Sequence, residues 1–437
     1  MYSYRYKSIS KFCGVMMTVR AARPVAPSGG LTATLALLSF VVPLSTDMYL
    51  PGFPAMAREL NTDAAGVQFT LTAFLVGLAA GQLALGPLSD RYERRKPILI
   101  GAGVCTLATA LCAVAPTLSM LIALRFVMGF AGAAGVVVGR AVVTDLATGA
   151  VAARLFGLLM ALGGIAPILA PLAGGVVVGG AGNWRAVFWV LAGASALMFV
   201  AALARVPETL PAERRHTDGA GALAKAAASV LTDRPYLGYT LAFCLATAAL
   251  FCYIAASPFL LQNVLGFSVG AASTVFSIGA LTATVSTLAG SRLVGRRTPR
   301  LLLRAGLALM LASSIAALLL TLTGHLTRAW ALGLIGAAFL GLGQVFATAT
   351  GLALERVPHA AGTGSAVLGM LQNALGAAVA PLMGVAGEHT AIPLFAGMTL
   401  CTLLASAALL LTRQNTADPE QSDLTAKPDR EGIIDIA

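Results

Sequence analysis

Apolar residues fall into long uninterrupted runs along this chain, and short polar stretches separate them. A membrane-spanning helix needs about 20 predominantly apolar residues, and twelve of the runs reach that length. The pattern therefore predicts an all-α integral membrane protein with twelve transmembrane helices. We expect the spans at residues 31–53, 67–89, 97–115, 118–144, 154–179, 184–206, 237–262, 269–291, 300–322, 329–355, 363–386 and 390–412.

The longest internal polar stretch divides the spans into two sets of six. We predict a cytoplasmic N-terminal tail (1–30), an N-terminal six-helix bundle (31–206), a cytoplasmic linker (207–236), a C-terminal six-helix bundle (237–412) and a cytoplasmic C-terminal tail (413–437). The two sets also repeat each other, because Ala170-Pro171-Leu172-Ala173-Gly174 recurs as Ala380-Pro381-Leu382-Met383-Gly384. Repeated halves with a site between them are typical of secondary transporters.

Composition narrows the class of protein further. Hydrophobic residues make up 58% of the chain and charged residues only 11%, against about 25% charged in soluble domains. Soluble enzymes, disordered chains and nucleic-acid-binding modules are therefore excluded. The net charge of +11 indicates the positive-inside rule rather than a nucleic-acid partner.

The basic residues also predict the orientation. On one side of the membrane, the predicted loops contain only three basic residues, Arg58, Arg185 and Arg328. Because basic loops stay in the cytoplasm, we expect both termini there. The partners we expect are the lipid bilayer, protons and a small-molecule substrate, with no nucleic acid, and we expect a monomer.

Two charged residues lie inside predicted spans, where an ionisable group is costly and indicates function. Asp47 in the first span and Arg125 in the fourth lie roughly 10 Å below the same surface, at 1.5 Å per helical residue. That depth suits an ion pair, or a carboxyl group that binds protons in competition with an arginine. The alternative is that the pair only locks the N-terminal half. A shift of about 210 residues places Ser257 opposite Asp47, so the C-terminal half lacks this charge.

Three further groups of residues are candidates for function. A charged cluster at the cytoplasmic border of the second and fourth spans predicts a gate, or alternatively a simple positive-inside anchor; it contains Asp90, Arg91, Arg94, Arg140 and Asp145. Glycines and prolines in the fifth span predict a bent hinge; they are Gly163, Gly164, Pro167, Pro171, Gly174 and Gly175. Polar residues in other spans could line a substrate cavity or form helix–helix hydrogen bonds; they are Tyr49, Tyr253, Gln344, Gln372 and Asn373.

Several of these segments resemble the major facilitator superfamily, and specifically its twelve-span drug:proton antiporters. The segment from Gly86 to Lys96 is similar to the cytoplasmic loop signature of that superfamily, although Glu93 stands where glycine is usual. Leu124-Arg125 with Gly129 resembles the fourth-span motif that is linked to proton coupling. The glycines and prolines of the fifth span resemble the motif of exporters.

A closer likeness is to the bicyclomycin-resistance subfamily. It rests on Ser45-Thr46-Asp47-Met48-Tyr49-Leu50-Pro51, Asn183-Trp184-Arg185-Ala186-Val187-Phe188 and Pro207-Glu208-Thr209-Leu210. This resemblance implies the major facilitator fold and proton-coupled efflux of drug-like compounds across a bacterial inner membrane, by alternating access. It also implies proton coupling for Asp47 and Arg125, and conformational gating for Asp90, Arg94 and Asp145.

Other functions remain as alternatives. A proton-coupled transporter of a small metabolite would share the fold, although the fifth-span motif argues against an importer. An intramembrane enzyme or a receptor is a further alternative, but all four histidines lie in loops or near span ends. The chain also lacks a phosphate-binding Gly-x-x-x-x-Gly-Lys motif. We therefore expect a secondary active transporter without a cofactor or metal, and not an enzyme.

Overall fold

The structure is a computed structural model that describes residues 28–147, 149–210 and 228–412. The described residues are α-helical apart from short 3₁₀ and π-helical turns and the connections between helices. Twelve of the helices or helix combinations are long and apolar enough to cross a membrane. The predicted all-α fold with twelve spans is confirmed.

Each half contributes six antiparallel spans. The N-terminal half comprises α1 (Gly29–Asp47), η2 (Leu50–Gly52), α2 (Phe53–Glu59), α3 (Ala64–Arg91), α4 (Arg95–Ala113), α5 (Leu118–Leu146), α6 (Gly149–Ala181) and α7 (Arg185–Arg205). The C-terminal half comprises α9 (Arg234–Phe259), η4 (Leu260–Val264), α10 (Val269–Leu293), α11 (Pro299–Leu322), α12 (Arg328–Leu354), η5 (Pro358–Ala360), α13 (Ala361–Val379), η6 (Ala380–Gly384), α14 (Ile392–Ala408) and η7 (Leu409–Thr412).

Polar residues in the short connections start the helices. Asp63 accepts a hydrogen bond from the backbone N–H of Gly66 at 2.8 Å and caps α3. Thr117, Ser268 and Thr327 cap α5, α10 and α12 in the same way. Such caps satisfy backbone donors that have no partner inside the helix. The apolar runs thus set the length of each span, and the polar residues between them set where it begins.

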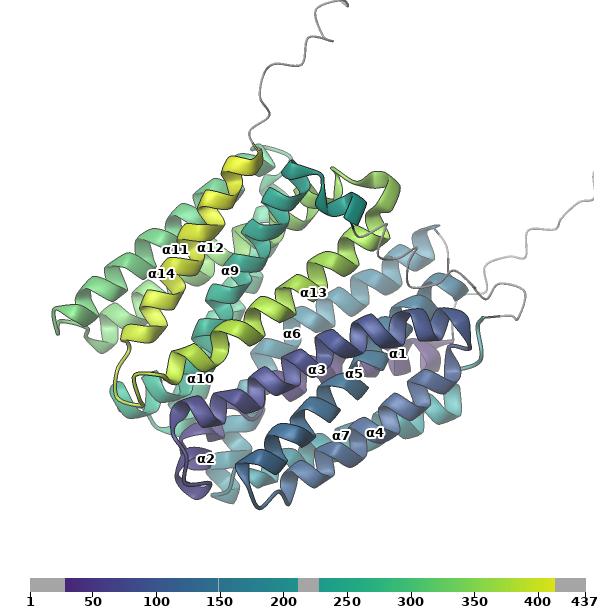
Figure 1. The fold of residues 1–437 in the computed structure, drawn as a ribbon, viewed down its shortest axis with the longest axis horizontal. Coiled ribbons are helices and arrows are strands. Elements are labelled where there is room, and N and C mark those ends of the chain that lie inside the picture. The colour runs from purple at the N-terminus through teal and green to yellow at the C-terminus, as the bar shows by residue number, and fades with distance from the viewer. Residues whose placement is uncertain (1–27, 148, 211–227, 413–437) are drawn as a thin grey trace, which may run out of the picture.

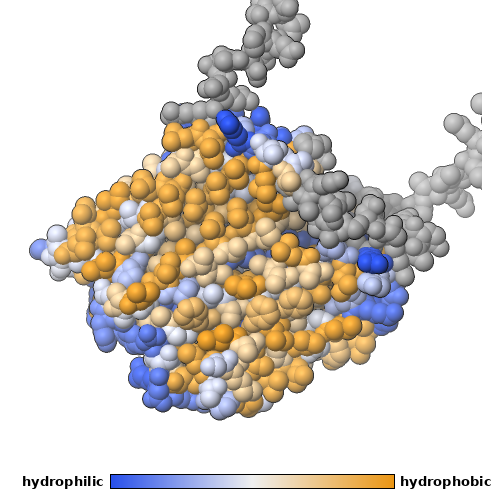
Figure 2. All heavy atoms as spheres, viewed as in Figure 1, coloured by the Kyte–Doolittle hydropathy of each residue, from blue (hydrophilic) through white to orange (hydrophobic). Residues whose placement is uncertain are grey.

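The two bundles lie side by side and spread apart toward one end (Figure 1). Residues 28, 210, 228 and 412 all lie at this end, because each half holds an even number of antiparallel spans. We call it the linker end, and the opposite end, which carries α2, the closed end. Figure 2 shows apolar side chains over the flanks of both bundles and hydrophilic side chains at the ends. That distribution matches a protein whose flanks face lipid.

The helix interruptions differ from the sequence expectation. The fifth span, in which prolines predict a bent hinge, continues as one helix through Pro167 and Pro171, and the bend stays a prediction. The first span instead ends its regular helix at Asp47 and resumes after a 3₁₀ turn. The seventh span ends in the π-helical turn η4, and the eleventh in the 3₁₀ turn η6. Proline accounts for this only partly: Pro51, Pro258 and Pro381 lie at these interruptions, where they remove a helical N–H donor.

Candidate functional site

A cavity of about 710 Å³ lies between the two halves. Its wall is mostly apolar and comes from α6 on one side and from α9, α10 and α12 on the other, with one ionisable side chain, Asp47 of α1. The lining residues are Asp47, Gly157, Ala161, Gly163, Gly164, Ile165, Pro167, Leu250, Ile254, Phe276, Ala280, Ala283, Thr284, Thr287, Leu288, Phe339, Leu342 and Phe346. This volume falls in the range of small-molecule sites, which are mostly apolar with a few placed polar groups.

Asp47 reaches the cavity because the first span breaks directly after it. It is the last residue of α1, and Met48 and Tyr49 lead into the 3₁₀ turn of η2. Its side chain is only 4% exposed. Within the described part of the chain, the Oδ1 atom has no hydrogen-bond partner. A carboxyl group in this setting is costly while it is charged, because burial removes its hydration without supplying a partner.

Arg125 of α5 contacts the first span next to this break. It is fully buried, and its guanidinium carbon lies 4.2 Å from the ring centre of Tyr49 and 4.3 Å from that of Phe74. Its Nη1 atom donates a hydrogen bond to the carbonyl oxygen of Ser45 at 3.1 Å. Carbonyls in the last turn of a helix lack partners and carry the negative end of the helix dipole. The arginine therefore caps the end of α1.

The two predicted coupling residues thus meet across one helix pair, but not as an ion pair. Arg125 contacts α1 through a backbone carbonyl two residues before Asp47, while Asp47 itself is one of the residues that line the cavity. No ion pair joins their side chains within residues 28–147. The equal depth of the two residues indicated the proximity correctly. Depth alone does not fix the direction of a side chain.

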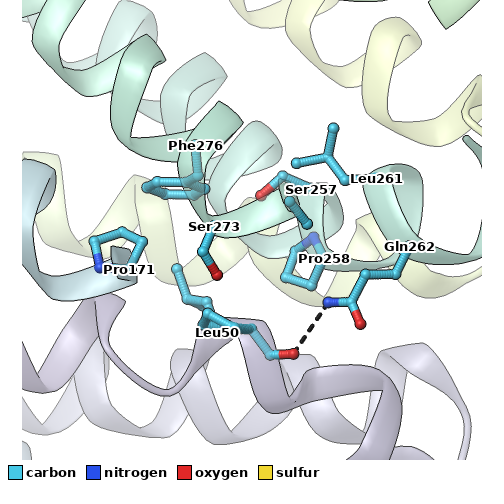
Figure 3. A pocket seen from close by; sticks show the side chains of 10 residues that line it. Leu50, Pro171, Ser257, Pro258, Leu261, Gln262, Ser273 and Phe276 are labelled. Atoms are coloured by element: carbon cyan, nitrogen blue, oxygen red, sulfur yellow. Dashed lines mark hydrogen bonds between the residues drawn. The ribbon is translucent and has the colours of Figure 1, made fainter. Parts of the chain in front are cut away.

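The closed end is sealed by backbone contacts between the halves. The side-chain Nε2 of Gln262 donates to the carbonyl oxygen of Pro51 at 3.0 Å, beside Pro171 and Ser273 (Figure 3). A Cβ atom on Gly175 would collide with Ser273, and one on Gly384 with the backbone of Ala65. Glycine at these crossings lets helices of opposite halves approach closely.

Further seals lie along the α3 side. Gln68 donates to the carbonyl oxygen of Ala255 at 3.1 Å, and Thr72 donates to that of Ala377 at 3.1 Å. The cavity therefore ends below a closed layer, while the bundles spread apart at the linker end (Figure 1).

A charged network lies at the linker end of the N-terminal half. Arg94 pairs with Asp145 at 3.0 Å, and its Nη1 donates to Ser89 at 2.9 Å. The hydroxyl of Thr209 donates to the same Asp145 carboxylate at 2.9 Å. Both members of the ion pair are largely buried, with side chains 9% and 18% exposed. The network joins the α3–α4 loop, the end of α5 and the segment after α7.

Glu208 caps α4 from the start of the linker. Its two carboxylate oxygens accept hydrogen bonds from the backbone N–H groups of Arg94 and Arg95, each at 3.0 Å. Partial burial raises the pKa of Glu208, but these bonds and one from the N–H of Leu210 outweigh it and hold the pKa below its usual range. A carboxylate at a helix N-terminus is stabilised by the free N–H groups there.

The sequence profile described as Major Facilitator Superfamily matches residues 35–381. This chain belongs to the major facilitator superfamily. A Bacillus subtilis protein named uncharacterized MFS-type transporter YdgK is 37% identical over 391 residues, which are 88% of this chain and 96% of that protein. A bicyclomycin resistance protein homolog of Haemophilus influenzae is 30% identical over 384 residues, 87% of this chain and 96% of that protein.

A solved structure of the same superfamily fold agrees with this assignment. The inward-facing, unoccupied structure of a bacterial homolog of the human lysosomal transporter Spinster superposes with a TM-score of 0.69. The match covers 88% of this chain and 96% of that one at 17% identity, and so it shows the fold alone. Together with the spans, these findings establish a multi-pass membrane transporter rather than an enzyme.

Only some residues of the superfamily loop signature take part in the charged network around Arg94 and Asp145. The side chain of Asp90 lies outside the described residues, while Arg91 is exposed and lies 5.7 Å from the ring centre of Tyr92. Arg140 is also exposed and, among the described residues, takes no part in the Arg94–Asp145 network. Glu93, the departure from the usual glycine, does not have a positive φ. The loop therefore does not need glycine's conformational freedom at this position.

None of the five predicted substrate-cavity residues is among those that line this cavity, and their contact with substrate stays a prediction. Tyr49 instead bonds Thr70 at 3.3 Å, Gln344 donates to Ser286 at 2.8 Å, and Asn373 donates to Gln82 at 3.4 Å. Tyr253 lies behind the wall, against the lining rings of Phe276 and Phe339. Gln372 is partly exposed but is not a lining residue. For Tyr49, Gln344 and Asn373, the alternative of helix–helix hydrogen bonds is the one the structure bears out.

The residues of the fifth-span motif line the cavity at one end of the motif and pack in the closed-end seal at the other. Gly163, Gly164 and Pro167 line the cavity, whereas Pro171 lies in the closed-end seal. Gly174 packs on the carbonyl of Met48, directly at the break of the first span, and the neighbouring Gly175 packs on α10.

Sequence reasoning missed the roles of Glu208, Ser89 and Thr209 in the network and of Thr284 in the cavity wall. The apolar wall itself carries no sequence signal, because lipid-facing residues look the same.

Proposed function

We propose that this protein is a proton-driven exporter of small drug-like compounds in a bacterial inner membrane. The linker end, with both termini, faces the cytoplasm in this proposal. The distribution of basic residues supports that orientation through the positive-inside rule. The bicyclomycin resistance homolog and the fifth-span resemblance support export of drugs. The main support for proton coupling is the charged residue in the wall of the cavity between the halves, Asp47.

The described conformation corresponds to the cytoplasm-facing state of such a cycle. Glycine crossings and amide-to-carbonyl hydrogen bonds seal the closed end, while the bundles spread at the linker end. Export requires the converse state, in which the linker end closes and the seal around Pro51 and Gln262 opens. Rocking of one repeat against the other around a central site is the general mode of such transporters.

Asp47 is the proton carrier in this account. Its carboxyl group contacts the cavity, and its Oδ1 has no partner. A proton neutralises the group when the cavity is empty, and a bound substrate replaces the proton. Substrate and proton therefore compete for one site, which is the minimal requirement for antiport. The structural alternative, that Asp47 only locks the N-terminal half, predicts loss of stability rather than loss of coupling when the charge is removed.

Arg125 positions the carrier. Its bond to the carbonyl of Ser45 fixes the end of α1 and hence the place of Asp47 two residues later. The break at Met48 and Tyr49 then gives the carboxyl group two positions in the cycle, one toward the cavity and one toward the arginine.

The cavity wall selects the chemical class of substrate. Phenylalanines and aliphatic side chains of α9, α10 and α12 form an apolar surface opposite Asp47. An amphiphilic cation or an uncharged amphiphile fits this surface, since its apolar part is buried and its polar part meets the carboxyl group and Thr284. An anionic compound would face the carboxylate without a cationic partner in the wall.

The Arg94 network forms the cytoplasmic gate. Arg94, Asp145 and Glu208 join α3, α4, α5 and the start of the linker within one half. Closure of the linker end has to move these elements together against the C-terminal half. Arg91 and Asp90 extend the gate in this proposal, and Arg140 is its outer rim. The glycines and prolines of α6 supply the surfaces over which α6 slides on α10.

Transport by inside-out vesicles tests the proposal. A susceptibility panel in a pump-deficient host, with bicyclomycin, chloramphenicol and ethidium, first identifies an exported drug. An imposed pH gradient, acidic inside, should then drive accumulation of that drug in vesicles with the wild-type protein. Asp47→Asn should abolish the accumulation while drug binding stays measurable, because the amide keeps the shape of the side chain but has no proton to exchange.

Glu355→Gln is the matched control, since Glu355 is an exposed acidic residue at the linker end. It should leave accumulation unchanged. Accumulation by Asp47→Asn at the wild-type level would refute the role of Asp47. A melting temperature that falls together with drug binding would favour the locking role instead. A pH gradient without effect on the wild type would refute proton coupling itself.

A further inference from the structure

A small recess lies at the linker end of the C-terminal half, on α9, α11 and η7 and apart from the cavity between the halves. Its volume is about 10 Å³, enough for one water-sized atom. The residues around it are Tyr239, Arg300, Leu303, Arg304, Leu409 and Thr412. The proposed transport cycle uses none of them.

One of the residues around the recess, Tyr239, has a buried hydroxyl group without a partner. Tyr239 is 3% exposed, and its hydroxyl group makes no hydrogen bond within the described residues. Buried hydroxyl groups in proteins are nearly always hydrogen-bonded, and exceptions call for an explanation. Gly238 makes this placement possible, because a side chain there would collide with Thr412 and with the carbonyl of Ala408. The close contact of α9 with the end of α14 thus holds the Tyr239 hydroxyl in a fixed place.

Two arginines form the rim of the recess. Arg300 and Arg304 are one helical turn apart on α11, which places their Cβ atoms about 6 Å from each other. Both are exposed, and neither forms an ion pair within the described part of the chain. They lie in the first two turns of α11, whose N-cap residue Thr298 makes no side-chain capping bond. The free N–H groups of that turn add to the positive potential.

Exposed apolar side chains continue from the rim along α11 and α14 toward the opposite end of these helices. Leu301, Ile315 and Leu319 of α11 are 51%, 40% and 56% exposed, and Leu403 of α14 is 51% exposed. The two helices pack against each other along this flank. A ligand at the recess therefore meets two arginines and a tyrosine hydroxyl at one end and a lipid-facing surface at the other. A free inorganic anion would use only the first of these.

We propose that this recess binds the phosphodiester headgroup of an anionic phospholipid. One non-bridging phosphate oxygen enters the recess and accepts the hydrogen bond of the Tyr239 hydroxyl. The guanidinium groups of Arg300 and Arg304 bind the remaining phosphate oxygens, a geometry for which arginine is suited. The acyl chains lie along the exposed leucines of α11 and α14. Basic recesses between spans at the membrane border are suited to such headgroups.

Native mass spectrometry of the full-length protein in detergent tests this proposal. Dioleoyl phosphatidylglycerol is titrated against the wild type and three variants, with the zwitterionic dioleoyl phosphatidylethanolamine as the comparison lipid. We expect the wild type to bind phosphatidylglycerol about tenfold more tightly than phosphatidylethanolamine. Tyr239→Phe should lower the phosphatidylglycerol affinity about fivefold to tenfold, as the loss of one hydrogen bond to a charged acceptor does. The double variant Arg300→Gln/Arg304→Gln should remove the preference between the two lipids.

Arg297→Gln is the matched control, because Arg297 is an exposed arginine of the preceding turn that does not line the recess. Its lipid affinities should equal those of the wild type. Equal phosphatidylglycerol affinity for the wild type, Tyr239→Phe and the double variant would overturn the proposal. That result is also the one expected if a carboxylate of the acidic segment after Arg413 occupied the recess.

An inorganic phosphate arm separates the two sources of a phosphate group. We expect 10 mM phosphate to leave phosphatidylglycerol binding within about twofold of its value without phosphate, because the lipid adds the contacts of its acyl chains. Displacement of the lipid by phosphate would assign the recess to a free anion and overturn the lipid proposal. Because substrate transport is not measured, the result is independent of the proposed export function.

Discussion

The two halves repeat one framework but carry different chemistry, and the first and seventh spans show this most directly. In the N-terminal half, α1 ends at Asp47 and a 3₁₀ turn follows; in the C-terminal half, α9 ends at Phe259 and a π-helical turn follows. Asp47 faces the cavity between the halves. Its counterpart Ser257 is fully buried in the closed-end seal and contacts the carbonyl of Ile254 at 3.5 Å.

The same division holds in the rest of the two bundles. The fully buried Arg125 and the Arg94–Asp145 pair belong to the N-terminal half. The C-terminal half supplies most of the apolar cavity wall, including Phe276, Phe339 and Phe346. The interrupted spans and the glycine crossings are thus shared by both repeats, whereas the chemistry is divided. The N-terminal half carries the buried charges, and the C-terminal half supplies most of the apolar recognition surface.

Removal of the buried arginine should break this division with the largest effect. We expect Arg125→Gln to lower pH-driven drug accumulation by at least about a hundredfold. The end of α1 loses its cap, and the rings of Tyr49 and Phe74 lose a cation–π contact that contributes about 2 kcal/mol or more when desolvated. Arg125→Lys should recover only a small part, since an ammonium group cannot replace a planar fork. Initial rates in inside-out vesicles measure both. Wild-type transport by Arg125→Gln would contradict the assigned role.

Substitution of a glycine at a helix crossing should have the same effect in both halves, whereas substitution of a charged residue should not. Gly175→Val and Gly384→Val each place atoms where the opposite half lies. We expect both to hold the closed end apart and to lower transport by about tenfold or more, as overpacked contacts cost typically 1–3 kcal/mol. Gly369→Val is the control on α13, because its Cβ position is free. Cysteine labelling at the closed end measures the opening, and unchanged labelling would count against the seal.

Truncation in the apolar wall should change recognition without changing coupling. We expect Phe339→Ala to raise the KM for an apolar drug about tenfold, as burial of a phenylalanine is worth about 1.5–3 kcal/mol. The dependence of the rate on the pH gradient should stay as in the wild type. Leu400→Ala, at a lipid-exposed position of α14, should change neither quantity. A shift in the pH dependence for Phe339→Ala would show that the two halves do not divide the work.

The smallest expected effect comes from a substitution of Glu208, which bonds the charged network at the linker end. Hydrogen bonds from backbone N–H groups hold the pKa of Glu208 below the ordinary value of 4.5. Its carboxylate therefore stabilises the fold above that pH, and the contribution disappears as the pH falls through the lowered pKa. We expect Glu208→Gln to lower the melting temperature by about 3 °C at pH 7. The difference from the wild type should shrink as the pH falls below 4.5, and a difference that stays constant through the acid range would contradict this origin.

The sequence predicts the spans well, because the lipid environment imposes both their length and their apolar character. Asp47 and Arg125 were identifiable because charge is costly in a bilayer. The side-chain directions were not, since they depend on the break after Asp47, which hydrophobic patterning does not show. Glu208 was assigned to the linker, because its partners Arg94 and Arg95 lie more than 110 residues away. The phenylalanines of the wall cannot be separated from lipid-facing ones until α9, α10 and α12 are placed around the cavity.

Proton release on drug binding tests the central claim, that Asp47 exchanges a proton for substrate, most directly. The drug from the susceptibility panel is titrated into purified protein at pH 7 by calorimetry, in two buffers with different ionisation enthalpies. We expect the wild type to release about one proton per bound drug, as competition for a single carboxyl group requires. The Asp47→Asn protein should bind the drug and release none. Equal proton release by both proteins would contradict the claim.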